Sequence, residues 1–326
     1  MDRADPLLRD AQLRAARDRE RRRLSRAQPR DGRHGASAGD LPGGPSVTPR
    51  RIGFRARDGL ALSALDFTGP EGRAPILCLH GITRCAQDFA ALAERHAGRR
   101  RVLALDLAGH GESARAASPA RYGIESALRD VLDAMAALHC PRAIIVGTSF
   151  GGILAMVLAV LRPGAVAGAV LNDIGPKLEP VGLGHVEGFV GHDPALPSLE
   201  AAMAHLRAVL PPHVIDEAGW RRFVSNTYAR GADGLWHPRW DIRIAEAMRA
   251  GGRVPELWGP FGALAHAPLM LLRGGLSQLL STETADRMRS ERPDMAFYEL
   301  PGNGHAPLLE APPVLAQIEP FLDGIP

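Results

Sequence analysis

The chain has 326 residues, of which 45% are hydrophobic and 23% are charged, a composition typical of a globular protein with one large α/β unit and an insertion, or with two compact domains. Residues 1–45 contain eleven arginines and seven acidic residues, so the formal net charge of +3 belongs to this segment. Because the rest of the chain has neither a basic stripe nor a run of roughly 18 apolar residues, we expect no nucleic-acid partner and no membrane span.

Three cysteines, Cys78, Cys85 and Cys140, cannot all pair with one another, and their spacing is not that of a zinc site. The N-terminus is charged and lacks the apolar core of a secretory signal. These features predict a cytoplasmic protein with reduced thiols and no bound metal.

Residues 1–49 are expected to form an Arg-rich tail and a linker rich in Pro and Gly, and the first folding signal follows them. Residues 51–67 contain two alternating runs around Asp58-Gly59, which is typical of a β-hairpin. Apolar strand candidates then alternate with predicted helices at residues 86–97, 124–139 and directly after Ser149. Continuous apolar strands separated by helices predict an α/β fold with a mostly parallel sheet covered by helices on both faces.

The alternation stops near Pro176 and resumes with "APLMLLRGG", a helix at 282–292, "MAFYELPG" and a last helix at 312–322. We therefore predict a core of residues 50–175 and 263–326, with a helical cap at 176–262 inserted between them.

Within the predicted cap, Ser198 is a candidate N-cap for a helix that Pro211-Pro212 would end. All four tryptophans of the chain fall in this range, and two roles are open for them: lining an apolar pocket, or packing the cap helices together. We select Trp220 and Trp240 as candidate substrate-binding residues.

The stretch "GTSFG", residues 147–151, places Ser149 between an apolar strand and a predicted helix. This context is typical of a nucleophile elbow, a sharp turn that exposes a reactive serine above the end of a sheet. Small residues on both sides let the strand and the helix approach closely, and the helix N-terminus favours negative charge near the serine.

Four further stretches occur in order along the chain: "LHGITR", "DLAGHGES", "LRGGLSQLLS" and "PGNGHAPLLE". Together with the serine motif, they make residues 51–325 resemble the α/β-hydrolase family, in its serine-nucleophile branch with a helical cap. The resemblance implies an α/β-hydrolase fold, and it says little about the substrate.

The resemblance also assigns candidate site residues. His305, in the last of the four stretches, matches the catalytic histidine that would act as general base for Ser149. The backbone N–H groups of Ile82 and Phe150 would form the oxyanion hole. We expect His80 and His110 to support loops rather than to react.

The acid of the triad is the point at which this chain departs from the family pattern. Gln278 stands in "RGGLSQLL" where an aspartate is expected, and a glutamine brings no negative charge to the imidazole. Asp173, at the end of the sixth strand candidate, is the alternative acid, because some relatives supply the acid from that position. Glu283 is a weaker substitute at the start of a helix, where acidic residues are common.

These residues predict a hydrolase without a cofactor that cleaves an ester, thioester or lactone of a small apolar substrate through an acyl-enzyme. One alternative is a carbon–carbon bond hydrolase of the β-diketone or ring-fission type. Another is a hydrolase-like ligand-binding protein with weak catalysis, which Gln278 keeps open. Arg84 either binds a substrate carboxylate or ties down its loop. No feature of the sequence indicates an oligomeric state.

Overall fold

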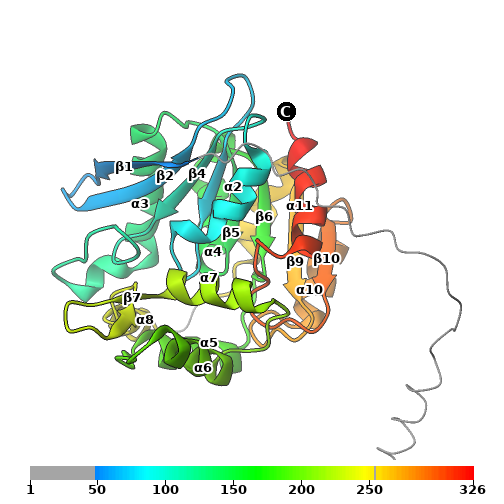
Figure 1. The fold of residues 1–326 in the computed structure, drawn as a ribbon. Helices are drawn as coiled ribbons and strands as arrows, with labels where there is room; N and C mark the ends of the chain where they lie inside the picture. The colour runs from blue at the N-terminus through cyan, green and yellow to red at the C-terminus, as the bar shows by residue number, and fades with distance from the viewer. Residues whose placement is uncertain (1–47, 253–254) are drawn as a thin grey trace, which may run out of the picture. The chain divides into compact units, whose positions relative to one another are not determined.

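The computed structural model describes residues 48–252 and 255–326, so most of the predicted tail and linker lies outside the described residues (Figure 1). An eight-stranded sheet forms the centre, with the strand order β1-β2-β4-β3-β5-β6-β9-β10. Neighbouring strands from β4 to β10 are parallel, and only the pairs β1–β2 and β2–β4 are antiparallel. The strands are β1 (Arg50–Arg55), β2 (Ala61–Phe67), β3 (Ile76–Leu79), β4 (Val102–Asp106), β5 (Ala143–Thr148), β6 (Val166–Asn172), β9 (Leu269–Gly274) and β10 (Ala296–Leu300). The mostly parallel sheet that the sequence predicts is confirmed.

The predicted hairpin forms the antiparallel edge of this sheet. Strands β1 and β2 pair with Arg55 opposite Ala61, and the turn between them contains Gly59 at a φ of 88°. This left-handed conformation has little steric cost for glycine, which explains why Asp58-Gly59 marks the turn.

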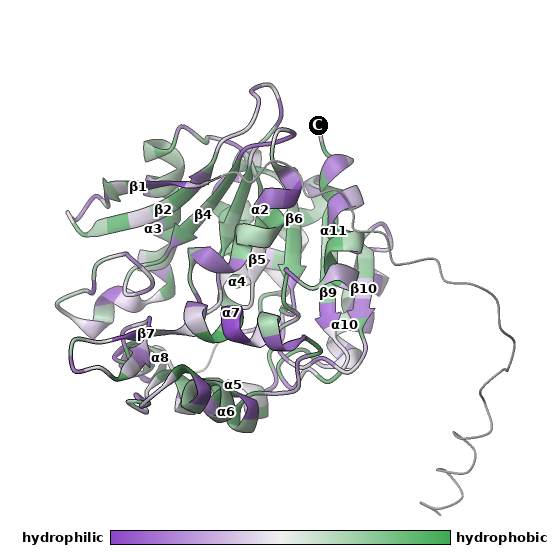
Figure 2. Ribbon diagram, in the orientation of Figure 1, coloured by the Kyte–Doolittle hydropathy of each residue, from purple (hydrophilic) through white to green (hydrophobic). Residues whose placement is uncertain are grey.

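Helices cover both faces of the sheet, and the inner strands, which are mostly apolar, are buried along their whole length (Figure 2). On one face, the side chains of α3 (Ile124–Ala137), α4 (Phe150–Leu161) and α10 (Thr282–Glu291) join a buried cluster with strand residues. On the other face, α2 (Ala90–His96) and α11 (Pro312–Asp323) belong to a second cluster. This three-layer arrangement buries both faces of a parallel sheet.

The predicted core helices are present with small differences at their ends. The helix expected at 86–97 consists of a short 3-10 turn, η1 (Ala86–Phe89), followed by α2. Three further 3-10 turns are η2 (Pro119–Tyr122), η3 (Pro163–Ala165) and η4 (Ala263–His266). None of the helices among residues 48–252 and 255–326 has the length and apolar character needed to cross a bilayer.

The segment between β6 and β9 contains α5 (Pro180–Val190), α6 (Leu199–Val209), α7 (Glu217–Thr227), α8 (Ile244–Gly251) and α9 (Trp258–Gly262). The Ser198 hydroxyl accepts a hydrogen bond from the Ala201 N–H at 3.1 Å, so the predicted N-cap of α6 is confirmed. A small hairpin of β7 (Tyr228–Arg230) and β8 (Trp236–Pro238) was not predicted.

Most of this segment has a hydrophobic cluster of its own, which also includes Tyr122 and a few other residues that precede β6 in the chain. Helix α9 lies inside the range predicted for the cap, but Phe261 is buried with α4 in the cluster of the sheet. We use the word cap below for residues 180–251.

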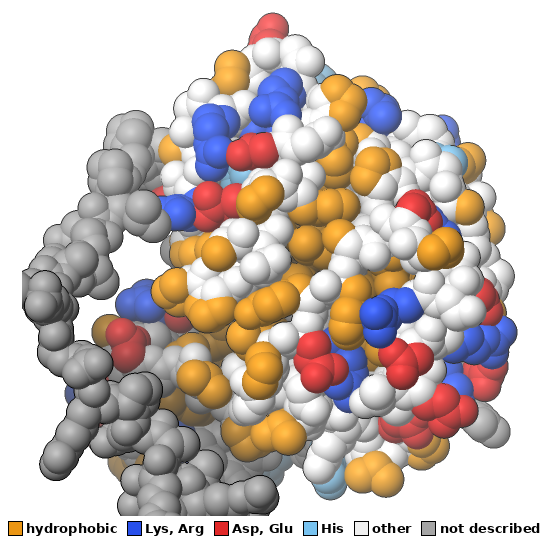
Figure 3. All heavy atoms as spheres, turned by 90° about the vertical axis from the view of Figure 1, so that its right-hand side faces the viewer, with side chains coloured by type: hydrophobic (Ala, Val, Ile, Leu, Met, Phe, Trp, Pro, Cys, Tyr) orange, Lys and Arg blue, Asp and Glu red, His pale blue; other side chains and the backbone are white. Residues whose placement is uncertain are grey.

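The surface of the described residues carries both signs of charge close together (Figure 3). Many arginines pair with carboxylates, as in Arg57–Asp133 at 2.7 Å and Arg95–Glu319 at 2.7 Å. Such exposed pairs contribute about 0–1 kcal/mol each, so they balance the surface charge and add little to the stability of the fold.

Candidate active site

Ser149 lies at the turn between β5 and α4, with φ 49° and ψ −113°. This left-handed conformation is strained for a serine and occurs where the surrounding backbone enforces it. The neighbouring glycines permit the turn: a Cβ on Gly151 would lie 2.0 Å from the Leu79 carbonyl oxygen, and one on Gly147 would lie 2.5 Å from the backbone of Gly151. The serine therefore stands on the sharp strand-to-helix turn that the motif predicts.

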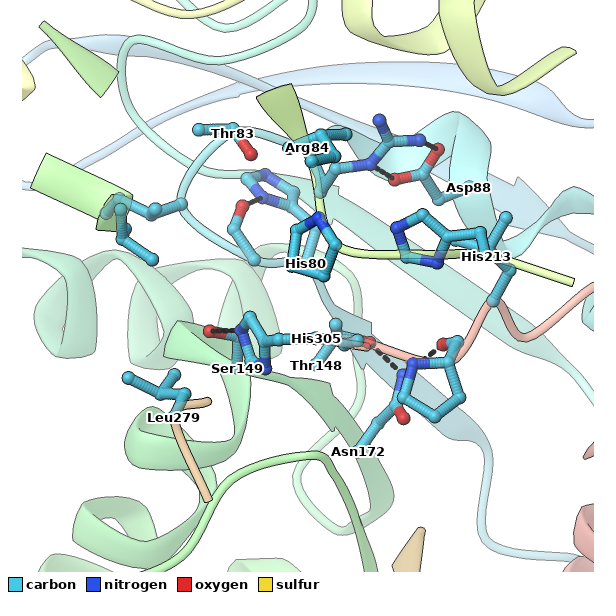
Figure 4. A pocket seen from close by; sticks show the side chains of 18 of the residues that line it. His80, Thr83, Arg84, Asp88, Thr148, Ser149, Asn172, His213, Leu279 and His305 are labelled. Carbon is cyan, nitrogen blue, oxygen red and sulfur yellow. Dashed lines mark hydrogen bonds and ion pairs between the residues drawn. The ribbon is translucent and has the colours of Figure 1, made fainter. Parts of the chain in front are cut away.

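Three side chains from three loops form a hydrogen-bonded series at this turn. The Nε2 atom of His305, which follows β10, lies 2.9 Å from the Ser149 Oγ (Figure 4). Its Nδ1 atom lies 2.7 Å from Oδ2 of Asp173, which follows β6. The Asp173 side chain is fully buried, and its Oδ1 accepts a hydrogen bond from the Gly274 N–H at 2.8 Å.

This series determines where the proton of the imidazole lies. A carboxylate can only accept hydrogen bonds, so Asp173 accepts from Nδ1–H of His305. The Nε2 lone pair then points at Ser149, where it can take the proton of the hydroxyl. The arrangement can thus activate a serine as a nucleophile.

Of the three candidates for the acid, Asp173 is the one that contacts His305. The Gln278 side chain turns instead to the cap, where its Oε1 accepts a hydrogen bond from Nδ1 of His185 at 3.0 Å. Glu283 is exposed in the first turn of α10. The position of Gln278 in the sequence motif therefore does not place it at the imidazole.

Two buried histidines hold the loop that contains Ile82. The Leu107 N–H donates to His80 Nε2 at 3.0 Å, so the other ring nitrogen donates to the Gly81 carbonyl at 2.7 Å. The His110 Nε2 lies 2.7 Å from the Ile82 carbonyl oxygen. Burial lowers the pKa of both histidines, that of His80 well below its ordinary value, and both rings contact the backbone as supports of this loop.

The backbone N–H groups expected to form the oxyanion hole belong to this loop and to the start of α4. Ile82 lines the same cavity as Ser149. Phe150 is the first residue of α4, so its N–H has no acceptor within the helix. Both groups are therefore in elements that meet at the serine.

Asn172 is a site residue that the sequence analysis missed. Its Nδ2 donates to Thr148 Oγ1 at 3.1 Å and to the Pro307 carbonyl at 2.9 Å, and its backbone oxygen accepts from the Ser149 N–H at 3.0 Å. A fully buried amide thus joins the serine turn to the histidine loop (Figure 4). A polar residue at the end of an apolar strand, directly before Asp173, is the signal that could have found it.

A cavity of about 160 Å³ lies in front of Ser149 and His305, between the sheet and the cap. Its wall is mainly apolar, with Ile82, Val186, Phe189, Leu210, Leu279 and Leu308 among the lining residues. A cavity of this kind fits a small, largely apolar molecule.

The tryptophans chosen as candidate substrate-binding residues do not line this cavity, which corrects that expectation. Trp240 is 1% exposed, and its Nε1–H donates to the Val190 carbonyl at 2.8 Å. Trp220 packs edge-on against Phe223 with ring centroids 5.7 Å apart. Both pack the cap, because the helices around them bury their large rings.

Arg84 lines the cavity, but its charge is already paired. Its Nε and Nη2 atoms each donate to a carboxylate oxygen of Asp88 at 2.6 Å, and Nη1 donates to the hydroxyl of Thr227. The guanidinium carbon lies 3.9 Å from the centroid of the Phe223 ring. These contacts favour the loop-tying role over binding of a substrate carboxylate.

A further histidine that lines the cavity, His213, was also missed by the sequence analysis. It lies between α6 and α7, and burial, with help from Arg84 and His305, lowers its pKa to about 4. In the sequence it appears only as one polar residue in a short loop, so no local pattern indicates its position.

Comparison with known proteins gives relatives over most of the chain. Residues 76–318 match the model of a family described as the alpha/beta hydrolase family. The chain is 30% identical to 3-hydroxybutyrate-oligomer hydrolase of Cupriavidus necator over 269 residues, an alignment that covers 78% of this chain and 90% of the relative. It is 29% identical over 270 residues to an esterase of Mycobacterium tuberculosis, with 79% and 85% covered.

Among solved structures, an alpha/beta hydrolase from Novosphingobium aromaticivorans superposes with a TM-score of 0.80 at 36% sequence identity. The match covers 84% of this chain and 98% of that structure. The similarity therefore includes both the sheet and most of the segment inserted after β6.

Proposed function

The chain belongs to the alpha/beta hydrolase family and is a hydrolase, and from this premise we propose that it cleaves carboxylic esters through an acyl-enzyme on Ser149. The observation that carries the proposal is the hydrogen-bonded series of Ser149, His305 and Asp173. The similarity to proteins named as ester and oligomer hydrolases supports the ester as the bond that is cleaved.

In the first half of the reaction, Nε2 of His305 takes the proton of the Ser149 hydroxyl as the oxygen attacks the ester carbonyl carbon. The carbonyl oxygen becomes an oxyanion, which the N–H groups of Ile82 and Phe150 stabilise. When the tetrahedral intermediate collapses, the imidazolium returns the proton to the leaving alkoxide. An alcohol departs, and the acyl group stays on Ser149.

In the second half, water replaces the alcohol. His305 takes a proton from the water molecule as its oxygen attacks the acyl carbon, and the same N–H groups hold the oxyanion. Collapse breaks the bond to Ser149, whose oxygen takes the proton back from the imidazolium. The products are a carboxylic acid and the free enzyme.

Asp173 orients His305 and stabilises the imidazolium in both halves. One of its carboxylate oxygens accepts a hydrogen bond from the Gly274 N–H and the other contacts the imidazole, which supports this role. The contact between Asp173 and His305 supports catalysis over the alternative of a binding protein with weak catalysis.

The apolar lining and small volume of the cavity support a short aliphatic acyl group as the substrate's main feature. Thioesters and lactones of the same size follow the same chemical steps. The expected substrates are thus small uncharged acyl compounds.

The test is the intact mass of the protein after exposure to a fluorophosphonate, which labels activated serines. We expect one adduct on the unmodified chain and none on Ser149→Ala. Ser225→Ala is the matched control, because Ser225 is an exposed serine on α7, and it should label like the unmodified chain. A folded Ser149→Ala protein that still takes one equivalent of the probe would disprove the assignment.

A further inference from the structure

The short loop of residues 211–214, between α6 and α7, is clamped onto the loop that carries His305. The Pro212 carbonyl accepts a hydrogen bond from the Gly304 N–H at 2.7 Å, and the Val214 N–H donates to Asn303 Oδ1 at 3.0 Å. A Cβ on Gly304 would lie 2.1 Å from Pro211, so the two loops are in close contact. The backbone on both sides of His213 is therefore fixed to the residues that precede His305.

The His213 ring lines the same cavity as Ser149, on the side where Figure 4 shows Arg84 and Asp88. The ring packs against Phe223 with centroids 5.5 Å apart, whereas its buried Nδ1 has no hydrogen-bond partner within residues 48–252 and 255–326. Because Nδ1 is enclosed by protein and the residue as a whole is only partly buried, a molecule in the cavity can reach the imidazole through the edge of the ring that lines the cavity.

The charge of the wall around His213 determines what kind of ligand fits it. The imidazole is neutral near pH 7, because burial and the nearby Arg84 lower its pKa to about 4. The guanidinium of Arg84 is itself paired with Asp88 at 2.6 Å. This part of the cavity therefore offers no free positive charge to a carboxylate.

With Nδ1 enclosed, the nitrogen left for a ligand is Nε2, which donates or accepts according to the tautomer of the neutral ring; a hydroxyl can pair with either form, because it donates as well as accepts. The clamp holds this imidazole at a constant position relative to His305, and the remaining wall is mainly apolar. The complementary substrate has a hydroxyl on an otherwise aliphatic chain, close to the scissile carbonyl.

We propose that His213 is a specificity-determining residue that binds a substrate hydroxyl group, so that the preferred substrates are esters of short hydroxylated aliphatic acids. This inference rests on the proposed ester hydrolysis at Ser149. It adds a second polar anchor to the site, which the catalytic series does not require.

The test compares kcat/KM for two esters that differ in one hydroxyl, ethyl 3-hydroxybutyrate and ethyl butyrate. For the full chain, we expect the hydroxylated ester to be favoured by about tenfold, as one additional hydrogen bond would give. In His213→Phe, which keeps an aromatic ring beside Phe223, the ratio should fall towards one. His213→Asn, which keeps a donor and an acceptor, should restore part of the preference.

His205→Phe is the matched control, because His205 is a partly buried histidine of the cap that does not line the cavity. This variant should keep the ratio of the unmodified chain. The proposal is overturned if the full chain has no preference for the hydroxylated ester, or if folded His213→Phe keeps the preference. If the protein still hydrolyses ethyl butyrate and Ser149 is still labelled, the proposed ester hydrolysis stands even though this inference fails. If the unmodified chain neither hydrolyses ethyl butyrate nor is labelled at Ser149, the proposed function fails as well.

Discussion

Replacing Asp173 by asparagine is the perturbation whose outcome the geometry defines best. The Gly274 N–H, 2.8 Å from Oδ1, requires an acceptor at that position. The amide oxygen of the variant would take this place, so its NH2 group would face Nδ1 of His305, where the carboxylate oxygen now lies at 2.7 Å. Because Nδ1 would then accept, the ring proton would move to Nε2, and Nε2 could no longer take the proton of Ser149.

The expected size of the effect follows from this change of tautomer. The corresponding substitution in a serine protease lowers kcat by about 10⁴. A factor of 10⁴ corresponds to about 5 kcal/mol of activation free energy, because each factor of ten is about 1.4 kcal/mol. We expect a loss of this order in Asp173→Asn, with a fold that stays intact because the new side chain has the same shape.

The assay is kcat for a short-chain ester, measured beside the melting temperature of each variant. Gln278→Ala is the comparison, since its side chain contacts His185 rather than His305, and it should lower kcat by far less than Asp173→Asn. A loss of less than tenfold in Asp173→Asn, or an equal loss in Gln278→Ala, would refute the assignment of the acid.

Two further predictions concern Asn172 and His96. Asn172→Ala removes the hydrogen bonds to Thr148 and Pro307 and should misplace the serine and the histidine. We therefore expect kcat to fall by about 10- to 100-fold while KM changes little. Equal effects on kcat and KM would contradict a positioning role. Burial lowers the pKa of His96 from 6.5 to about 4, so protons bind the unfolded state more strongly in this range, and stability is lost as pH falls from about 6.5 towards 4. The free energy of unfolding, measured with urea at pH 7 and at pH 5, should fall by about 2 kcal/mol less in His96→Leu than in the unmodified chain. The same fall in both proteins would contradict this account.

Sequence patterns predicted the elements that depend on local order. The inner strands of the sheet are mostly apolar, and the turn at Ser149 requires small residues at fixed neighbouring positions, so both have a signature within a few residues. Asp173 was open to prediction for a similar reason, because the ends of adjacent parallel strands lie at the same edge of a sheet.

The parts that sequence patterns could not predict depend on how distant segments pack. Gln278 has the motif position of an acid, and only the docking of α5 shows that its partner is His185. A tryptophan such as Trp240 can line a pocket or pack a core, and its hydrogen bond to the Val190 carbonyl forms only in the assembled cap. His213 reaches the cavity because its loop is clamped to the histidine loop, a contact between residues about ninety positions apart.

Arg84 joins two parts of the molecule that serve different steps of the reaction. It follows Ile82 by two residues, and its side chain contacts Thr227 and Phe223, which belong to α7 of the cap. Any outward movement of α7 must break these contacts and release the backbone next to the expected oxyanion hole. In the proposed mechanism, an opening of the cavity by movement of α7 would therefore also loosen the groups that stabilise the transition state, so that catalysis would require the return of α7.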